Sequence, residues 1–342
     1  MFELLKLLCD APGVSGSEKS VREIILNEIQ DHSDCSVDRL GNIIAFKKGA
    51  QRASTRLMLC AHMDEVGLIV TAVTEEGFLK FAPVGGIDPR VVLGRRVAFA
   101  NGRAIGVIGT KAVHLQDAEE KKTSPPFDKL YIDIGALSRE DALKYVSPGD
   151  TAVFDSDYVE FGDGYLKARA LDDRAGCVIL TELIKSDLTY DCWFAFTVQE
   201  EVGLRGAKTA AFAVKPEAAL IIETTTAADI PYVDEYKKVC ILGQGPVLGF
   251  MDNRTLYDRG LFEFARSTAE SKGIKSQIKQ AVAGGNDAGA IHVSNDGVKT
   301  LAVSLPCRYL HSPSCVIKKE DAVETLKLVK ELALSVAGGA VC

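Results

Sequence analysis

The chain has 342 residues, a formal net charge of −7, 47% hydrophobic residues and 25% charged residues. This balance is typical of folded globular proteins and excludes disorder, collagen-like repeats or a coiled coil as the main architecture. No apolar run reaches the roughly 20 residues that cross a bilayer, so we expect no integral membrane protein. Lys and Arg form no concentrated cluster, which argues against nucleic-acid binding.

Nine cysteines are scattered along the chain without a C-x-x-C pair. Several, such as Cys60 and Cys240, lie in apolar runs, where a reduced cysteine packs as a small hydrophobic residue. The N-terminal segment carries Glu3 early and lacks a basic leader, so it predicts a short amphipathic helix and not a signal peptide. Together these features predict a cytoplasmic protein with free thiols.

The first 65 residues combine helix and strand patterns. Apolar residues recur at helical spacing from Val21 to Ile29, and apolar runs at 43–46 and 56–62 predict strands. Between 66 and 165 the pattern changes to short β runs separated by turn residues. No helix of normal length is needed there, so we expect a small all-β domain.

From residue 166 onward strands and helices alternate. Such alternation predicts an α/β fold with a mostly parallel sheet sandwiched by helices. Because residues 1–65 share this texture, we expect one α/β domain, made of 1–65 and 166–342, interrupted by a β-barrel-like domain at 66–165. The predicted elements are helices at 175–184, 255–272 and 318–337 and strands at 192–198, 218–223 and 300–306.

Polar side chains gather where the predicted strands end. In open α/β sheets ligands bind at the carboxyl ends of the strands. Two histidines with several carboxylates are a ligand set for zinc or another first-row divalent ion, and this set is rich enough for two ions. The candidate residues are His62, Asp64, Asp172, Asp173, Glu200, Glu201, Glu223 and His311.

Each of these features also has a structural explanation. Asp173 is expected to cap the helix that follows it while Asp172 binds metal, since Asp is a good N-cap residue. Glu200 and its neighbour taken alone would be an ordinary charged turn. Asp287 fits a helix cap as well as a substrate contact, and Asp88 is expected to stabilise a turn with Arg90. The combination of acids and histidines at one sheet edge favours the metal site.

Several motifs together make the sequence similar to a known family. The chain resembles the tetrahedral (TET) aminopeptidases, dinuclear metallopeptidases that include glutamyl aminopeptidases and some members labelled endoglucanases. Their order and separation match across nearly the whole chain. The motifs are AHMDEVG (61–67), GGIDPRVVLGRRV (85–97), ALDDRAG (170–176), VQEEVGLRGA (198–207), the acid of IIETT and RYLHSP (308–313).

The resemblance implies a role for each ligand. Asp172 would bridge two divalent metal ions, with zinc or cobalt expected. His62 and Glu223 would complete one site, and Glu201 and His311 the other. The sequence departs from the family at Glu223, where Asp is more frequent, and we expect ligation to survive with altered reach.

The resemblance also implies the catalytic groups and the assembly. Glu200 would be the general base and acid, Asp64 would orient His62, and the bond between Asp172 and Asp173 would be cis. The domain at 66–165 would mediate dimerisation, and the dimers would form a tetrahedral dodecamer.

The expected function is a metal-dependent aminopeptidase that removes N-terminal residues from short peptides. A hydroxide bridging the two metals would attack the peptide carbonyl while Glu200 moves the proton. A deacylase or carboxypeptidase on the same two-metal fold is the nearest alternative, followed by a glycosidase and by a metal-stabilised binding protein. The preferred first residue stays open. Asn286, where many relatives have Thr, lies in a loop that bears on specificity in this family.

Overall fold

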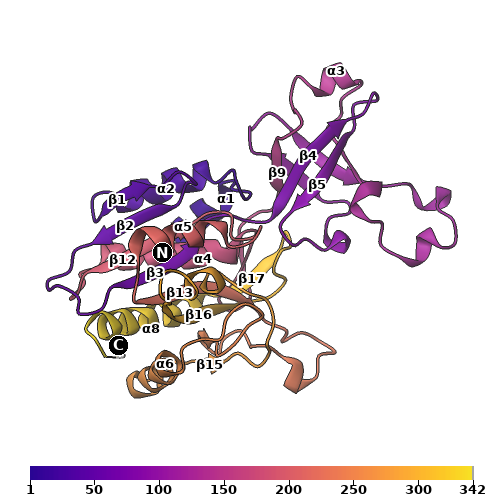
Figure 1. Ribbon diagram of the computed structural model, residues 1–342. Coiled ribbons are helices and arrows are strands. Elements are labelled where there is room, and N and C mark those ends of the chain that lie inside the picture. Colours follow the sequence, from indigo (N-terminus) through magenta and orange to yellow (C-terminus); the bar gives the residue numbers. More distant parts are fainter. Residues whose placement is uncertain (341–342) are drawn as a thin grey trace.

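The computed structural model describes residues 1–340. It contains an eight-stranded mixed sheet with helices, a closed six-stranded barrel and a separate three-stranded sheet. Figure 1 shows the barrel projecting from the body that contains the large sheet. The α/β class and the presence of a small barrel, both predicted from the sequence, are confirmed.

Four central strands of the large sheet are parallel neighbours, in the order β12-β3-β13-β16, and the flanking pairs β2-β12 and β14-β16 are antiparallel. Parallel strands start at one edge and end at the other, so polar residues that follow them converge. The strands in spatial order are β1 (Asp34–Val37), β2 (Ile43–Lys47), β12 (Cys192–Thr197), β3 (Leu57–His62), β13 (Ala218–Thr226), β16 (Lys299–Cys307), β14 (Val247–Leu248) and β15 (Gln277–Ile278).

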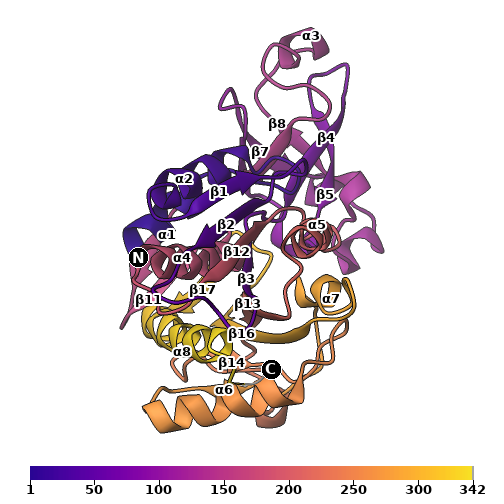
Figure 2. The same cartoon turned by 60° about the vertical axis from the view of Figure 1, so that its left-hand side comes forward.

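Helices cover the central strands on both sides, as the two views together show (Figures 1 and 2). Successive strand residues face opposite ways, so Leu57 and Leu59 pack in one core cluster while Met58 and Cys60 pack in another. The first cluster includes α1 (Phe2–Asp10), α2 (Lys19–Ile29), α4 (Leu171–Lys185), α6 (Arg259–Lys272) and α8 (Lys319–Ala337), and the second includes α5 (Arg205–Val214) and α7 (Ala288–Ile291).

The barrel has its own apolar core, separate from those of the sheet. Its helical segments are short, the longest being the one-turn α3 (Arg139–Ala142). The barrel strands in order are β4 (Gly67–Val73), β5 (Leu79–Val84), β8 (Tyr131–Asp133), β7 (Ile105–Gly109), β6 (Arg96–Phe99) and β9 (Thr151–Phe154), and the three-stranded sheet is β10 (Val159–Phe161), β11 (Tyr165–Ala168) and β17 (Cys315–Lys318).

Two helices differ from the sequence-based expectation. The helix predicted for 255–272 begins only at Arg259, because the Asp258 carboxylate accepts the Leu261 N–H and caps it there. Helix α5 was not predicted. Its buried face consists largely of Gly and Ala, which give little apolar contrast along the sequence.

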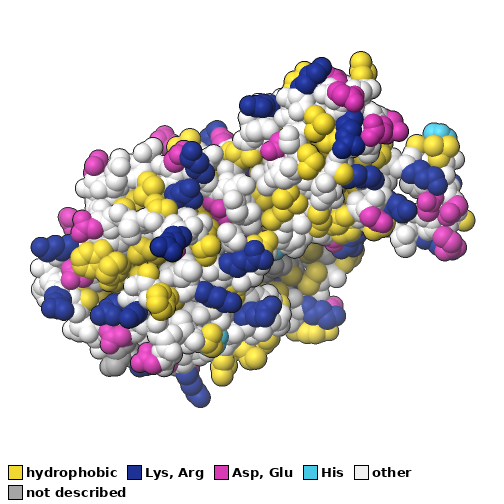
Figure 3. All heavy atoms as spheres, turned by 45° about the horizontal axis from the view of Figure 1, so that its top comes forward, with side chains coloured by type: hydrophobic (Ala, Val, Ile, Leu, Met, Phe, Trp, Pro, Cys, Tyr) yellow, Lys and Arg dark blue, Asp and Glu magenta, His cyan; other side chains and the backbone are white. Residues whose placement is uncertain are grey.

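The surface charges are mixed and the described cysteines are free, as expected from the sequence. Figure 3 shows Lys and Arg side chains interspersed with Asp and Glu over the face in view. The eight cysteines within residues 1–340 are all free, and seven of them are buried. In the same part of the chain, every helix is too short or too polar to cross a membrane.

Candidate metal centre

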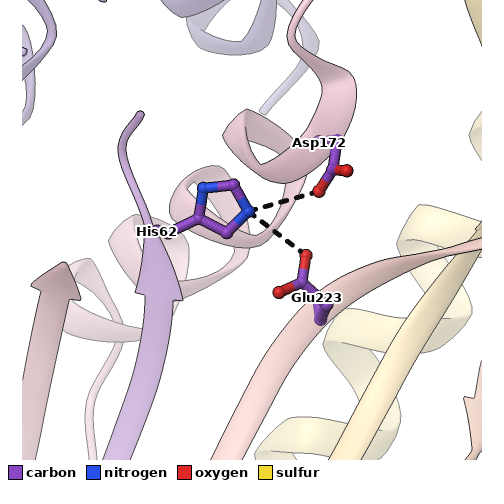
Figure 4. Close-up of side chains that lie close together, drawn as sticks. All are labelled: His62, Asp172 and Glu223. Atoms are coloured by element: carbon purple, nitrogen blue, oxygen red, sulfur yellow. Dashed lines mark hydrogen bonds and ion pairs between the residues drawn. The ribbon is translucent and has the colours of Figure 1, made fainter. Parts of the chain in front are cut away.

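Three predicted ligands meet at the carboxyl edge of the large sheet. His62 ends β3, and the parallel register of β3 with β13, in which Cys60 lies opposite Ile221, brings Glu223 level with it. Asp172 lies at the start of α4, where its non-helical φ and ψ turn it out of the helix. His62 Nε2 lies 3.3 Å from Asp172 Oδ1 and 3.5 Å from Glu223 Oε1 (Figure 4). We name these three residues the His62 group.

A second set of ligands shares Asp172. His311 Nε2 lies 3.4 Å from Asp172 Oδ2 and 3.2 Å from Glu201 Oε2. We name Asp172, Glu201 and His311 the His311 group. Both new members come from loops, one after β12 and one between β16 and β17. Asp172 therefore offers one carboxylate oxygen to each histidine.

Both groups suit a first-row divalent cation. In each group a histidine nitrogen and two carboxylate oxygens lie within 4.8 Å of one another. One imidazole and two carboxylates are a mixed nitrogen and oxygen donor set that zinc accepts, with room for a further ligand. The donor chemistry therefore fits two ions, one in each group.

The electrostatics of the groups show an excess of negative charge. Burial lowers the pKa of His62, but the Glu223 and Asp172 carboxylates outweigh it and hold the pKa well above its usual range. Burial also opposes the charge of His311, yet Asp172 and Glu201 raise its pKa to about 12. Burial raises the pKa of Glu223 to about 8. Cations bound here would supply the positive charge that the carboxylates otherwise take from protonated imidazoles.

The second ring nitrogen of each histidine is also held. His62 Nδ1 lies 3.0 Å from the Asp64 carbonyl oxygen and 3.5 Å from the Asp64 carboxylate. His311 Nδ1 lies 2.8 Å from the carbonyl oxygen of Gly86, which belongs to the segment after β5 of the barrel. Such contacts fix the tautomer and the ring orientation of a ligating histidine.

Glu200 lies beside both groups without joining either. It is only 9% exposed, and its backbone N–H donates to Asp64 Oδ1 at 2.9 Å. The other Asp64 oxygen accepts the Glu201 N–H at 3.1 Å and the Ser15 hydroxyl at 2.6 Å. Burial raises the pKa of the Glu200 carboxyl well above its usual range, and neighbouring carboxylates such as Glu223 add to the effect. Asp64 thus holds the loop that presents both glutamates.

Asp173 accepts hydrogen bonds from both α4 and β3. The Asp172–Asp173 peptide bond is cis, as the family resemblance predicts. Asp173 Oδ1 accepts the Gly176 N–H at 3.0 Å, and Oδ2 accepts the His62 N–H at 3.3 Å. The predicted capping role of Asp173 is confirmed.

Asp88 and Arg90 make the predicted turn contacts. Asp88 accepts the Arg90 N–H at 2.8 Å and pairs with its guanidinium. Asp88 also lines the cavity described below, which the sequence did not indicate.

Asp287 contacts residues of β3 and β12 and does not cap α7 with its side chain. It is 1% exposed and accepts hydrogen bonds from Thr197 Oγ1 and, at 3.5 Å, from Cys60 Sγ. Its Oδ1 has no hydrogen-bond partner among the described residues. Burial raises the pKa of Asp287 to about 6.

Glu65 was not anticipated as part of the site's support. Its carboxylate pairs with Arg169 and lies 3.3 Å from the Arg174 guanidinium, and all three side chains are buried. It also accepts the Gly13 N–H at 3.1 Å, and Arg174 donates to the Leu8 carbonyl oxygen. This network ties the N-terminal segment to the start of α4. The sequence pattern could not indicate this network, because Arg169 and Arg174 lie 104 and 109 positions after Glu65.

A cavity of about 350 Å³ opens on the two groups. Its lining joins residues of the large sheet to Gly86 and Asp88 of the barrel side and to the loop at 283–286. Asn286, expected in a loop that bears on specificity, lines it. Lys279 also lines it and was not singled out by the sequence.

Comparisons with known proteins bear on what this site does. Residues 41–328 match the family model described as M42 glutamyl aminopeptidase, a family of metallopeptidases. Lysyl aminopeptidase of Pyrococcus furiosus is 32% identical over 340 residues, with 97% of this chain and 96% of its own length covered.

Two solved structures are similar over nearly their whole length. An aminopeptidase from the archaeon Desulfurococcus kamchatkensis has a TM-score of 0.93 at 33% identity, with 99% of this chain and 96% of that chain covered. The TET1 peptidase of Pyrococcus horikoshii, which can assemble into a tetrahedron or a large octahedral shell, has a TM-score of 0.87 at 41% identity, with 97% and 99% covered.

These matches confirm the resemblance found in the sequence motifs and favour the peptidase interpretation over a glycosidase. The residues that the motifs predicted as ligands lie together and line one cavity. The chain belongs to the M42 glutamyl aminopeptidase family and is a hydrolase of peptide bonds.

Proposed function

We propose that this protein is a two-metal aminopeptidase that removes N-terminal residues from short peptides. The observation that carries the proposal is the position of Asp172, whose two carboxylate oxygens face two different histidines. A shared carboxylate between two ligand sets is what a pair of neighbouring divalent ions requires.

The residues that would hold the ions follow from the two groups. Asp172 would bridge, His62 and Glu223 would bind one ion, and Glu201 and His311 the other. Zinc and cobalt both suit these donors. When bound, the ions polarise the substrate carbonyl and make water more acidic. Glu223 keeps its carboxylate within 3.5 Å of His62 Nε2, which supports ligation by the longer acid at this position.

Glu200 would move the proton. As general base it takes a proton from the attacking water, and as general acid it passes that proton to the departing amine. Its position outside both groups leaves it free to do so, and Asp64 fixes the backbone that carries it. A raised pKa suits a carboxyl that must both accept and release a proton near neutral pH.

The substrate and the assembly follow the same proposal. The acids at the site would hold the α-amino group of a peptide, which limits cleavage to its first residue. We propose that the barrel domain, residues 66–165, forms dimers and that these build a tetrahedral dodecamer in the cytoplasm. The tetrahedron that the TET1 peptidase of P. horikoshii can form supports the tetrahedral assembly. An enclosed shell would admit peptides and exclude folded proteins.

The test is hydrolysis of aminoacyl-p-nitroanilides with and without an N-acetyl group, before and after chelation. We expect cleavage of free-amine substrates alone, loss of activity on chelation and recovery with zinc or cobalt. Cleavage of the acetylated substrates would instead support a deacylase or carboxypeptidase. Bound metal without any turnover would support a metal-stabilised binding protein.

A further inference from the structure

The loop that carries Glu200 is held through the backbone N–H groups of four consecutive residues, 198–201. They directly follow β12, and each N–H donates to a side chain from the first 65 residues. The pairs are Val198 to Asn42 at 2.9 Å, Gln199 to Glu18 at 3.2 Å, Glu200 to Asp64 at 2.9 Å and Glu201 to Asp64 at 3.1 Å. Side chains of the N-terminal segment therefore set the course of this loop.

Glu18 holds the strained residue of the loop. Gln199 has a positive φ of 56°, a left-handed backbone conformation that a residue with a side chain keeps only when its surroundings hold it there. Its N–H donates to Glu18 Oε1, which also accepts the Gly16 N–H at 2.6 Å. Glu18 thus contacts the residue directly before Glu200.

The Glu18 carboxyl is buried without a cation. It is 3% exposed, and no ion pair within residues 1–340 involves it. Burial raises its pKa by more than the hydrogen bond from the Gly16 N–H lowers it. Glu18 does not line the cavity, so it is placed to hold backbone and not to meet the substrate.

We propose that Glu18 is a positioning residue for the reaction, which aims the Glu200 carboxyl at the substrate by accepting the Gln199 N–H. This inference rests on the proposed function, because Glu200 is the proton-transferring group there. A shift of about 1 Å in a reacting group can cost about 100-fold in rate. Glu201 depends less on Glu18, since its N–H bonds to Asp64 and its carboxylate contacts His311.

Two substitutions separate the hydrogen bond from the bulk of the side chain. Glu18→Met keeps the length of the side chain but removes the acceptor, and Glu18→Gln keeps an acceptor oxygen. With leucyl-p-nitroanilide and excess zinc, we expect kcat of Glu18→Met to fall about 10- to 100-fold. KM should change little, because Glu18 does not line the cavity. Glu18→Gln should restore most of kcat.

A double-mutant cycle tests whether Glu18 acts through Glu200. In the Glu200→Gln background the base is already lost, so adding Glu18→Met should lower the residual rate little further. An equal fold-loss in both backgrounds would mean that Glu18 stabilises the protein generally, and it would overturn the inference.

Asp321 provides the matched control. It is also a buried carboxyl that accepts two backbone N–H groups, those of Gly243 and Gly245 at 2.7 Å, and none of these residues lines the cavity. Asp321→Leu should lower the melting temperature as Glu18→Met does but leave kcat unchanged. A loss of kcat as large as that of Glu18→Met would show that destabilisation, and not positioning, explains the effect.

Hydrogen exchange of the full chain gives a readout that needs no turnover. The amides of 199–201 should exchange faster in Glu18→Met than in wild type, and Glu18→Gln should resemble wild type. Unchanged exchange, or a wild-type kcat in Glu18→Met, would overturn the inference and leave the aminopeptidase standing. If the metal-loaded wild type cleaves no free-amine substrate, the proposed function is wrong, and the exchange rates still decide whether Glu18 holds the loop.

Discussion

The His62 group and the His311 group contain the same kinds of ligand but are built differently. His62 ends a buried strand and its side chain is 2% exposed, and Glu223 lies on the neighbouring strand. His311 lies in a loop at a positive φ of 58°, and its side chain is 34% exposed. Its ring nitrogen Nδ1 contacts the carbonyl oxygen of Gly86, on the barrel side. Sheet pairing therefore positions the His62 group, whereas contacts between segments far apart in the sequence position the His311 group.

Replacing Glu200 should have the largest effect on activity. It should leave metal binding by the His62 group and the His311 group unchanged. Glu200→Gln keeps the shape of the side chain but removes the base, so we expect kcat to fall about 10²- to 10⁴-fold. Both groups should keep their ions, since Glu200 belongs to neither. Metal analysis of the purified variant checks this. A lower metal content would mean that Glu200 is a ligand.

Graded chelation tests whether the two groups hold their metal ions equally tightly. We expect metal to leave in two steps, the His311 group first, because the His311 side chain is 34% exposed and that of His62 only 2%. His311→Ala should start with about one ion per chain and lack the first step. His62→Ala should lose the strand-borne ion and nearly all activity. Simultaneous loss of both ions in wild type would contradict the difference between the groups.

Asp64 contacts one member of each group, His62 and Glu201, and should therefore affect both. Asp64→Ala leaves two backbone N–H groups and the Ser15 hydroxyl without their acceptor, which should cost about 1–3 kcal/mol of unfolding free energy. Activity should fall about 10- to 100-fold. Asp258→Ala, which removes the cap of α6 far from the ligands, is the control. It should lower stability by about 0.5–2 kcal/mol without changing kcat.

Asp287 should have the smallest effect on activity, and we expect it to appear as a pH dependence of stability. Its pKa of about 6 lies above the ordinary value of 3.8, so the folded state binds a proton that the unfolded state has released. Stability from this group is therefore present below pH 4 and lost as the pH rises to about 6. Asp287→Asn cannot titrate, so wild type should lose about 2 to 3 kcal/mol relative to it across this window.

Thermal unfolding of both proteins between pH 4 and 7, in chelator so that metal release does not contribute, measures the difference. Parallel stability curves for wild type and Asp287→Asn would show that the carboxyl is already ionised in the folded protein below pH 4.

Much of the His62 group could be predicted because local pattern and sheet pairing agree there. An apolar run that ends in His62 is a buried parallel strand, and its edge collects the acids that follow the other strands. Glu201 and His311 were candidates because they follow predicted strands, and the family resemblance implied which ion each would bind. Their positions depend on positive φ values at Gln199 and His311 that no periodicity signals.

Other parts of the site could not be predicted for a definite physical reason. Lys279 follows a two-residue strand, which is too short to leave a pattern, and its place in the cavity wall depends on pairing with β14. Asp287 looked like a helix cap because it precedes a helix, but the tertiary contact with Thr197 takes its carboxylate instead. The positions of Lys279 and Asp287 therefore depend on contacts with residues far away in the sequence.

The pairing of Glu65 with Arg169 has a consequence for the order in which the molecule can be completed. On the ribosome, Glu65 emerges 104 residues before Arg169, so the nascent chain exposes a carboxylate whose buried partner has not yet been made. An unpaired charge of this kind is costly to bury. The buried network around Glu65 can therefore be completed only after the whole barrel has been synthesised and translation has passed Arg174.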